Sequence, residues 1–140
     1  MRTSIDTNIL VALWDADDLL NRAAKGALDA ALARGGLVIS GVVYAELLAA
    51  PRRTRAFIDR FCDEAGIEVE WEMNERIWRG AGEAFQGYAE RRRKQKGTES
   101  RRILVDFLIG AHALVSGYKL LTLDERMYQA SFPRLAIVSL

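Results

Sequence analysis

The sequence predicts an α/β protein, a three-layer α/β/α sandwich in which helices cover both faces of a parallel β-sheet. Short apolar runs alternate with longer helix-forming segments along all 140 residues. Alternation of this kind is typical of parallel sheets, because the connection between parallel strands is usually a helix. No repeat, low-complexity tract or linker interrupts the pattern. We therefore expect a single domain over residues 1–140.

The first half of the chain contains three predicted strands. Gly35-Gly36 ends one predicted helix, and Pro51 stops another because proline lacks the N–H that a helix interior requires. Gly66 introduces the third strand. The predicted elements are, in order, strand 2–5, helix 7–13, helix 17–33, strand 37–39, helix 42–49, a further helix to about residue 65, and strand 67–71.

The second half is predicted to begin with a long amphipathic helix, because Ile77, Ala81 and Tyr88 recur at helical spacing. The polar letters QKGTES break this helix, and Gly117 closes the next one. The predicted elements are helix 74–96, helix 101–116, strand 119–123, a short helix around Met127, and strand 136–138.

The composition is that of an ordinary folded domain, with 50% hydrophobic and 28% charged residues. Neither a signal peptide nor a membrane-spanning run is predicted, so we expect a cytoplasmic protein that does not enter a membrane. With Cys62 as its one cysteine the chain has no internal disulfide and no cysteine cluster for zinc or iron–sulfur.

Four acids occur in unusually apolar surroundings: Asp6 in RTSIDTNIL, Glu46 in VVYAELLAA, Asp106 in RRILVDFLIGAHAL and Asp124 in KLLTLDERMY. An isolated carboxylate in such a place is costly, so each needs a hydrogen-bonding, cationic or metal partner. Asp6 and Asp124 directly follow predicted strands, and Glu46 lies in the helix after another. Ligands of parallel sheets bind beyond the carboxyl ends of the strands, so these acids are expected at one edge.

Asp106 is the strongest anomaly, because Asp106 and His112 are the polar residues in the run ILVDFLIGAHALV. A helix that is apolar nearly all round is buried, and Gly110 permits close packing. His112 lies roughly 120° around this helix from Asp106, so we interpret it as a core or interface residue and not as a base.

Each acid also has a simpler interpretation. Asp6 and Asp124 could cap the helices that follow them, and Glu46 could lie on an exposed flank. A shared cation accounts for all four acids together. Carboxylates without histidine or cysteine suit Mg²⁺ or Mn²⁺, which favours hydrolysis of a phosphodiester. Ser40 and Thr122 end strands beside the acids, where they could orient carboxylates or water or could merely close turns.

A basic segment at residues 89–102 carries seven Lys or Arg against two acids, although the net charge of the chain is +1. Such a cluster can bind RNA by displacing counterions from phosphates, or it can be a solvated helix end and loop. The candidate RNA-binding residues are Arg91, Arg92, Arg93, Lys94, Arg101 and Arg102.

The order of these motifs resembles the PIN domain, and most closely the VapC toxins of bacterial toxin–antitoxin pairs. The similar motifs are Asp6-Thr7-Asn8, Glu46 in a helix after Ser40, Asp106 in DFLIGAHAL, and Thr122-Leu123-Asp124. The resemblance covers essentially the whole chain, including the ending YQASFPRLAIV.

The resemblance implies a PIN-like sandwich with a five-stranded parallel sheet and an endoribonuclease that depends on Mg²⁺ or Mn²⁺. It assigns Asp6, Glu46 and Asp106 as the three main acids and Asp124 as a fourth, more variable one. All four would be catalytic and metal-binding, and Asn8 and Thr122 would support them.

The resemblance also implies partners. The substrate would be structured RNA, such as transfer or ribosomal RNA. A VapB-like antitoxin would neutralise the toxin through its tail, homodimers and toxin–antitoxin hetero-oligomers would form, and operator DNA would be bound through the antitoxin.

Two other functions remain open from the sequence. A phosphatase could use Asp6 as a phosphate acceptor, although a haloacid-dehalogenase-like enzyme would need an aspartate where this chain has Asn8. The chain could also be a non-catalytic module of the same fold that binds nucleic acid or protein.

Overall fold

The structure, a computed structural model, describes residues 1–95 and 102–140. Within these residues, five strands form one parallel sheet in the order β3-β2-β1-β4-β5. The strands are β1 (Thr3–Ile5), β2 (Leu37–Ser40), β3 (Ile67–Glu70), β4 (Lys119–Leu121) and β5 (Ile137–Val138). The helices are α1 (Thr7–Trp14), α2 (Asn21–Arg34), α3 (Gly41–Leu47), α4 (Arg55–Ala65), α5 (Glu75–Lys94), α6 (Leu104–Ser116) and α7 (Glu125–Ser131).

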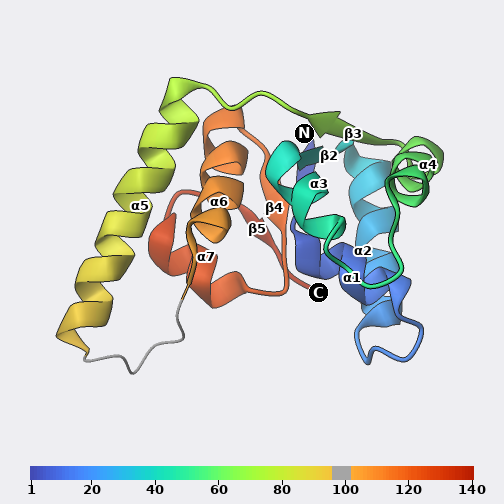
Figure 1. Ribbon diagram of the computed structural model, residues 1–140, viewed down its shortest axis with the longest axis horizontal. Helices are drawn as coiled ribbons and strands as arrows, with labels where there is room; N and C mark the ends of the chain where they lie inside the picture. Colours follow the sequence, from blue (N-terminus) through green and yellow to red (C-terminus); the bar gives the residue numbers. More distant parts are fainter. Residues whose placement is uncertain (96–101) are drawn as a thin grey trace.

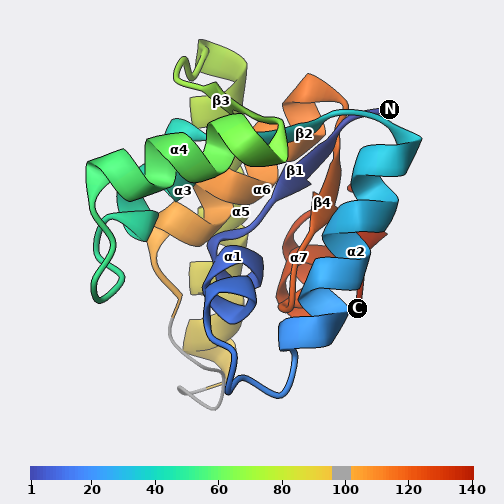
Figure 2. The ribbon, with the colours of Figure 1, turned by 90° about the vertical axis from the view of Figure 1, so that its right-hand side faces the viewer.

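Helices cover the sheet on both sides, which confirms the predicted three-layer sandwich. Figures 1 and 2 show α5 and α6 on one side of the sheet and α2 and α4 on the other. The central strands are buried apart from Lys119 at the start of β4, with Ile5, Ile39 and Leu120 fully inaccessible to solvent. Burial on both faces explains why these strands read as continuous apolar runs and not as alternating ones.

Helix α2 begins at Asn21 and not at Asp17 as predicted. The Asp15 carboxylate accepts the N–H of Asp17 at 3.0 Å, and the Asp18 carboxylate accepts the N–H of Leu20 at 2.8 Å. Aspartate side chains that bind the backbone two residues ahead stabilise turns, and here they hold residues 15–20 outside the helix.

Helix α6 begins at Leu104, and its first turn departs from the prediction. Ile103 and Leu104 are 57% and 41% exposed, so the apolar run is not buried at its start. Burial is continuous from Phe107 to Ala113. Gly110 lies against the ring of Phe132, which confirms the predicted close packing.

His112 is 1% exposed, as predicted for a core residue. Its Nε2 lies 2.8 Å from Glu70 Oε1, and the Tyr118 hydroxyl donates to Glu70 Oε2 at 2.5 Å. The contact between His112 and Glu70 therefore holds α6 against the end of β3. None of the helices in the described residues is long and apolar enough to cross a membrane.

Candidate active site

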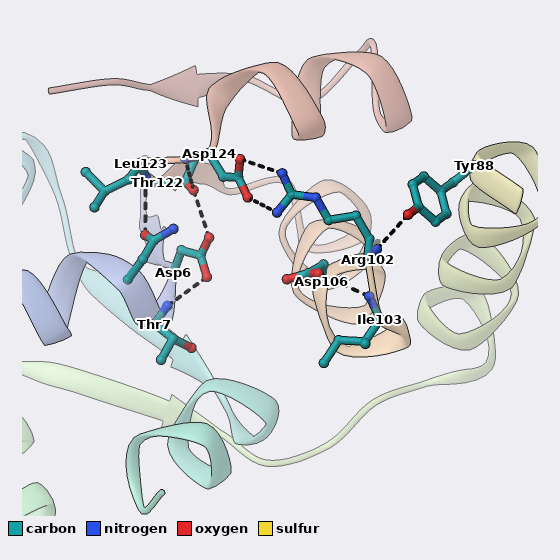
Figure 3. A network of polar contacts seen from close by, with 10 residues as sticks. Asp6, Thr7, Tyr88, Arg102, Ile103, Asp106, Thr122, Leu123 and Asp124 are labelled. Carbon is teal, nitrogen blue, oxygen red and sulfur yellow. Dashed lines mark hydrogen bonds and ion pairs between the residues drawn. The ribbon is translucent and has the colours of Figure 1, made fainter. Parts of the chain in front are cut away.

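The candidate site lies where the strand order reverses. From β1 the chain adds β2 and β3 on one side and later β4 and β5 on the other, so the reversal falls between β1 and β4. In parallel sheets this is the preferred place for a ligand. Asp6 follows β1 and Thr122 follows β4, and the Thr122 hydroxyl donates to Asp6 Oδ2 at 2.7 Å (Figure 3). The predicted meeting of these strand ends is confirmed.

Asp6 is both a helix cap and a buried acid. Its Oδ1 accepts the Thr7 N–H at 2.8 Å at the start of α1, and the residue is 5% exposed. Burial raises the pKa of the Asp6 carboxyl to about 6, with a smaller contribution from the charge of Asp106, while the hydrogen bonds from Thr122 and Thr7 oppose the rise. A cap alone needs no burial, so the simpler interpretation explains only part of this residue.

Asp106 lies in the first turn of α6, and its carboxylate projects toward the side on which Asp6 lies (Figure 3). Its Oδ2 accepts the Ile103 N–H over a long 3.4 Å. Burial raises the pKa of Asp106, the Ile103 N–H and the Arg102 charge lower it, and the Asp124 charge raises it. The charges of the three aspartates thus influence one another across the gap between α1, α6 and α7.

Asp124 is bound by an arginine and does not cap α7. In the described residues its side chain makes no cap hydrogen bond, so the predicted alternative of a cap is wrong. Arg102 donates from Nη1 to Asp124 Oδ2 at 2.5 Å and from Nη2 to Oδ1 at 3.1 Å. The backbone N–H of Asp124 donates to Thr122 Oγ1 at 3.0 Å. Thr122 therefore connects Asp6 with Asp124.

Glu46 is half-buried in α3 and lies beside the start of α1. The Thr7 hydroxyl donates to Glu46 Oε1 at 2.6 Å, while the Thr7 N–H binds Asp6. Glu46 and Asp6 are thus linked through one residue. Glu46 is therefore a partly buried residue that contacts the start of α1, and its role in the site stays a prediction.

The supporting residues have structural roles in the site. Ser40 caps α3, its Oγ accepting the Val43 N–H at 3.4 Å. Asn8 Oδ1 accepts the Leu123 N–H at 3.2 Å, which holds the loop after β4 against α1. Leu123 lies outside β4. The strand ends at Leu121, two residues before its predicted end.

Sequence reasoning missed Thr7 and Tyr128. Tyr128 is 1% exposed, and its hydroxyl has no hydrogen bond of ordinary geometry within the described residues. Burial, and then the charges of Asp6 and Asp106, raise the pKa of Tyr128, so the hydroxyl lies close to the acids. Its position four residues after Asp124, on the same face of a helix, was the available signal.

The candidate RNA-binding residues divide into two groups. Arg91, Arg92, Arg93 and Lys94 form the last turn of α5, whereas Arg102 lies in the site. Arg101 lies outside the described residues.

The predicted metal centre stays a prediction. In residues 1–95 and 102–140 no group of three or more His, Cys, Asp or Glu is gathered closely enough to hold a metal ion. The donor chemistry nevertheless fits a hard cation, because the site contains carboxylates and hydroxyls without histidine or cysteine. The raised pKa values of Asp6 and Asp106 also identify a place where added positive charge would be favourable.

Comparison with known families identifies the fold. The model of the PIN domain matches residues 4–133. The chain belongs to the PIN-domain family. The residues matched run from β1 to just beyond α7, so the PIN domain includes all four acids.

Solved structures share the PIN fold at low sequence identity. A chain of VapBC2 from Rickettsia felis, bound to a DNA fragment from its promoter, is 20% identical with a TM-score of 0.69, over 99% of this chain and 98% of that one. A chain of VapBC-1 from nontypeable Haemophilus influenzae is 22% identical with a TM-score of 0.68, again over 99% and 98%.

A third similar structure is VapC20 of Mycobacterium tuberculosis, a toxin that cleaves the sarcin–ricin loop. It is 18% identical with a TM-score of 0.54, over 84% of this chain and 85% of that one. No curated protein matches the chain in sequence. The fold predicted from the resemblance to VapC toxins is confirmed.

Proposed function

We propose that this PIN domain is a VapC-type toxin, an endoribonuclease that depends on Mg²⁺ or Mn²⁺ and hydrolyses phosphodiester bonds of structured RNA. The observation that carries the proposal is the buried Asp6, which faces Asp106 at the switch point of the sheet. Two nearby carboxylates repel each other when both are ionised, and this repulsion opposes folding. Such an arrangement therefore indicates a ligand with positive charge.

The metal would be held by Asp6 and Asp106, with Glu46 and Asp124 beside them. When bound, it would polarise a phosphodiester oxygen and activate a water for attack. Thr122 and the Thr7 N–H fix the orientation of the Asp6 carboxylate. With a pKa of about 6, Asp6 is mostly ionised at neutral pH, as a cation ligand must be.

Asp124 already has a cationic partner in the site. Both of its oxygens accept hydrogen bonds from Arg102. We therefore assign Asp124 as a metal ligand that also holds Arg102 in the site, because each carboxylate oxygen has a second lone pair.

The proposed partners are an RNA substrate, such as transfer or ribosomal RNA, a VapB-like antitoxin and a second copy of the chain. Support comes from the similar structures, which include VapBC complexes and a toxin that cleaves the sarcin–ricin loop. Operator DNA would be bound through the antitoxin. Membership of the PIN-domain family favours nuclease chemistry over an aspartate-based phosphatase.

The proposal is tested with purified protein, Mn²⁺ and total cellular RNA. Asp106→Asn and Asp6→Asn should each lower cleavage about a hundredfold or more, because each removes a charge on which binding of the ion depends. Asp63→Asn, at an exposed position on α4, should cleave like the wild type. EDTA should abolish cleavage.

Metal binding has a second readout that is independent of activity. Mn²⁺ should raise the melting temperature of the wild type and of Asp63→Asn but not of Asp6→Asn. Cleavage that persists in EDTA and in both site variants would refute the nuclease assignment. RNA binding without any metal-induced shift would identify a non-catalytic binding module instead.

A further inference from the structure

A groove lies between α5 and α7, directly beside the acids. Its volume is about 700 Å³. Six of the residues that line it matter here: Tyr88, Arg91, Arg102, Asp124, Arg126 and Ser131. We call it the α5–α7 groove. Asp124 belongs both to this groove and to the acidic site, so a ligand in the groove lies next to a ligand at the acids.

The charge of the groove is positive. The described residues that line it include one acid, Asp124, and three arginines, which are Arg91, Arg102 and Arg126. That acid is already paired with Arg102, at side-chain exposures of 31% and 30%. The charges of Arg91 and Arg126 are therefore not cancelled by the lining, and Arg91 makes a long hydrogen bond of 3.4 Å to the neutral Ser131 hydroxyl.

Arg102 is held in place from two directions. Its guanidinium makes the two-pronged contact with Asp124, and its backbone N–H donates to the Tyr88 hydroxyl at 2.6 Å (Figure 3). A guanidinium has five N–H donors, and Asp124 uses two of them. Within the part of the chain that the structure describes, the other donors of the Arg102 side chain are available to a ligand. Fixing the side chain in advance reduces the entropy that binding would cost.

The chemistry of this groove matches a phosphate. Guanidinium groups bind phosphate oxygens through paired N–H donors, and several of them around one space favour a polyanion over a single small anion. The proposed substrate carries a phosphate on each nucleotide, so the neighbours of the cleaved phosphate lie one nucleotide away along the same strand.

We propose that the α5–α7 groove is a binding subsite for an RNA phosphate next to the one that is cleaved. Arg102 is its fixed anchor, and Arg91 and Arg126 bind from the walls. This subsite rests on the proposed nuclease function. The subsite also assigns a role to the Arg102–Asp124 ion pair, because the pair places the Arg102 guanidinium at the border between the acids and the groove.

Two other grooves differ from this one. The groove after β3 is lined by Glu68, Glu70 and Glu72, which would repel phosphate. A groove of about 760 Å³ between α5 and α6 contains Arg76 and Arg134 but none of the four acids. Its similar size and charged residues make it a suitable control.

The test measures RNA binding in the Asp106→Asn background, where the probe is not cleaved. The probe is a fluorescein-labelled oligouridylate of about 12 nucleotides, within the usual footprint of a single-strand site. Binding is followed by fluorescence anisotropy at several salt concentrations. The test variant R91A/R126A leaves Arg102 on Asp124, so no acid is uncovered.

R91A/R126A should weaken binding about tenfold at low salt, the amount expected when charge-assisted hydrogen bonds to phosphate are removed. The slope of log affinity against log salt should become shallower by about 0.7 for each phosphate that is no longer bound. R76A/R134A removes the same charge from the control groove. That variant should change affinity by less than about twofold.

R91Q/R126Q, which keeps polar side chains, replaces the alanine pair if circular dichroism shows that the pair melts early. Equal losses for R91A/R126A and R76A/R134A would overturn the subsite and leave only general attraction to basic charge. Cleavage of total RNA by the wild type with Mn²⁺ is measured separately. A protein that cleaves RNA but binds the probe equally well with and without Arg91 and Arg126 therefore refutes the subsite and not the nuclease.

Discussion

Asp6 illustrates how one residue combines folding and function. Its carboxylate accepts two hydrogen bonds, one from the start of α1 and one from the loop after β4, and it is almost fully buried. These bonds position the group, but they do not fully offset the loss of water, so its pKa is raised to about 6. In the metal-free protein the ionised carboxylate therefore opposes folding.

The contribution of Asp6 to the stability of the metal-free protein should fall as the pH rises. A pKa near 6 in the folded state, against 3.8 when unfolded, means that the folded state holds the proton more tightly. The contribution of Asp6 to stability is then greatest below about pH 4, falls through the interval up to pH 6, and is lower by about 3 kcal/mol at neutral pH.

Asp6→Asn should remove this dependence, because asparagine keeps an acceptor for the Thr7 N–H but does not ionise. Urea unfolding in EDTA across this pH range measures the difference. The stability advantage of the variant should grow with pH and level off above about pH 7. Parallel curves of unfolding free energy against pH for the two proteins would show that the pKa of Asp6 is not raised by folding.

The residue scale also shows what the sequence could predict. Asp6 and Thr122 were predictable as neighbours, because parallel strand ends meet at one edge. The pair between Arg102 and Asp124 was not, since nothing in either local sequence specifies a partner 22 positions away. The same holds for Glu70 and His112, which meet only when β3 and α6 are both packed on the sheet.

At the scale of elements, α6 matters most because it carries Asp106 at one end and His112 toward the other. Its position depends on the close approach of Gly110 to Phe132, where a methyl group would lie 2.7 Å from Phe132 Cδ2. The start of α2 was mispredicted. Side-chain hydrogen bonds in the turn at residues 15–20 outweigh the weak preference of these residues for a helix.

Gly110→Ala should destabilise the protein by about 1 to 3 kcal/mol, since the overlap with Phe132 outweighs a gain of about 1 kcal/mol in helix propensity. Gly82→Ala in α5 is the matched control, because nothing lies within 4 Å of an added methyl group there. That variant should be slightly more stable than the wild type. Thermal unfolding compares the two.

A second substitution checks the cause. In the Gly110→Ala background, Phe132→Leu should recover part of the lost stability by making room for the methyl group. If Gly110→Ala and Gly82→Ala have the same effect, α6 does not depend on the close contact.

At the scale of the whole molecule, the sheet joins the two halves of the chain. Strand β1 pairs with β2 on one side and with β4 on the other, so neither half contains a complete sheet. The predicted number and order of strands along the chain are confirmed because burial on both faces leaves a strong apolar signature. The spatial order of the strands, and the spacing of the acids within residues 1–95 and 102–140, depend on distances that apolar patterns do not specify.

We expect residues 1–140 to unfold as one domain. Trp14 packs on Phe57 and Phe61 in the N-terminal half, whereas Trp78 lies on α5. Thermal transitions followed by tryptophan fluorescence and by far-ultraviolet circular dichroism should therefore coincide. Two separated transitions would indicate independent domains.

The hydrogen bond between Thr122 and Asp6 joins residues 116 positions apart. Protein synthesis proceeds from the N-terminus, so Asp6 is made long before Thr122, its partner just after β4. A nascent chain that stops before β4 has neither Thr122 nor Asp124 and leaves the place beside β1 empty. The acidic site is therefore complete only after residues 122–124 have been synthesised, and the activity that we propose is absent from shorter nascent chains.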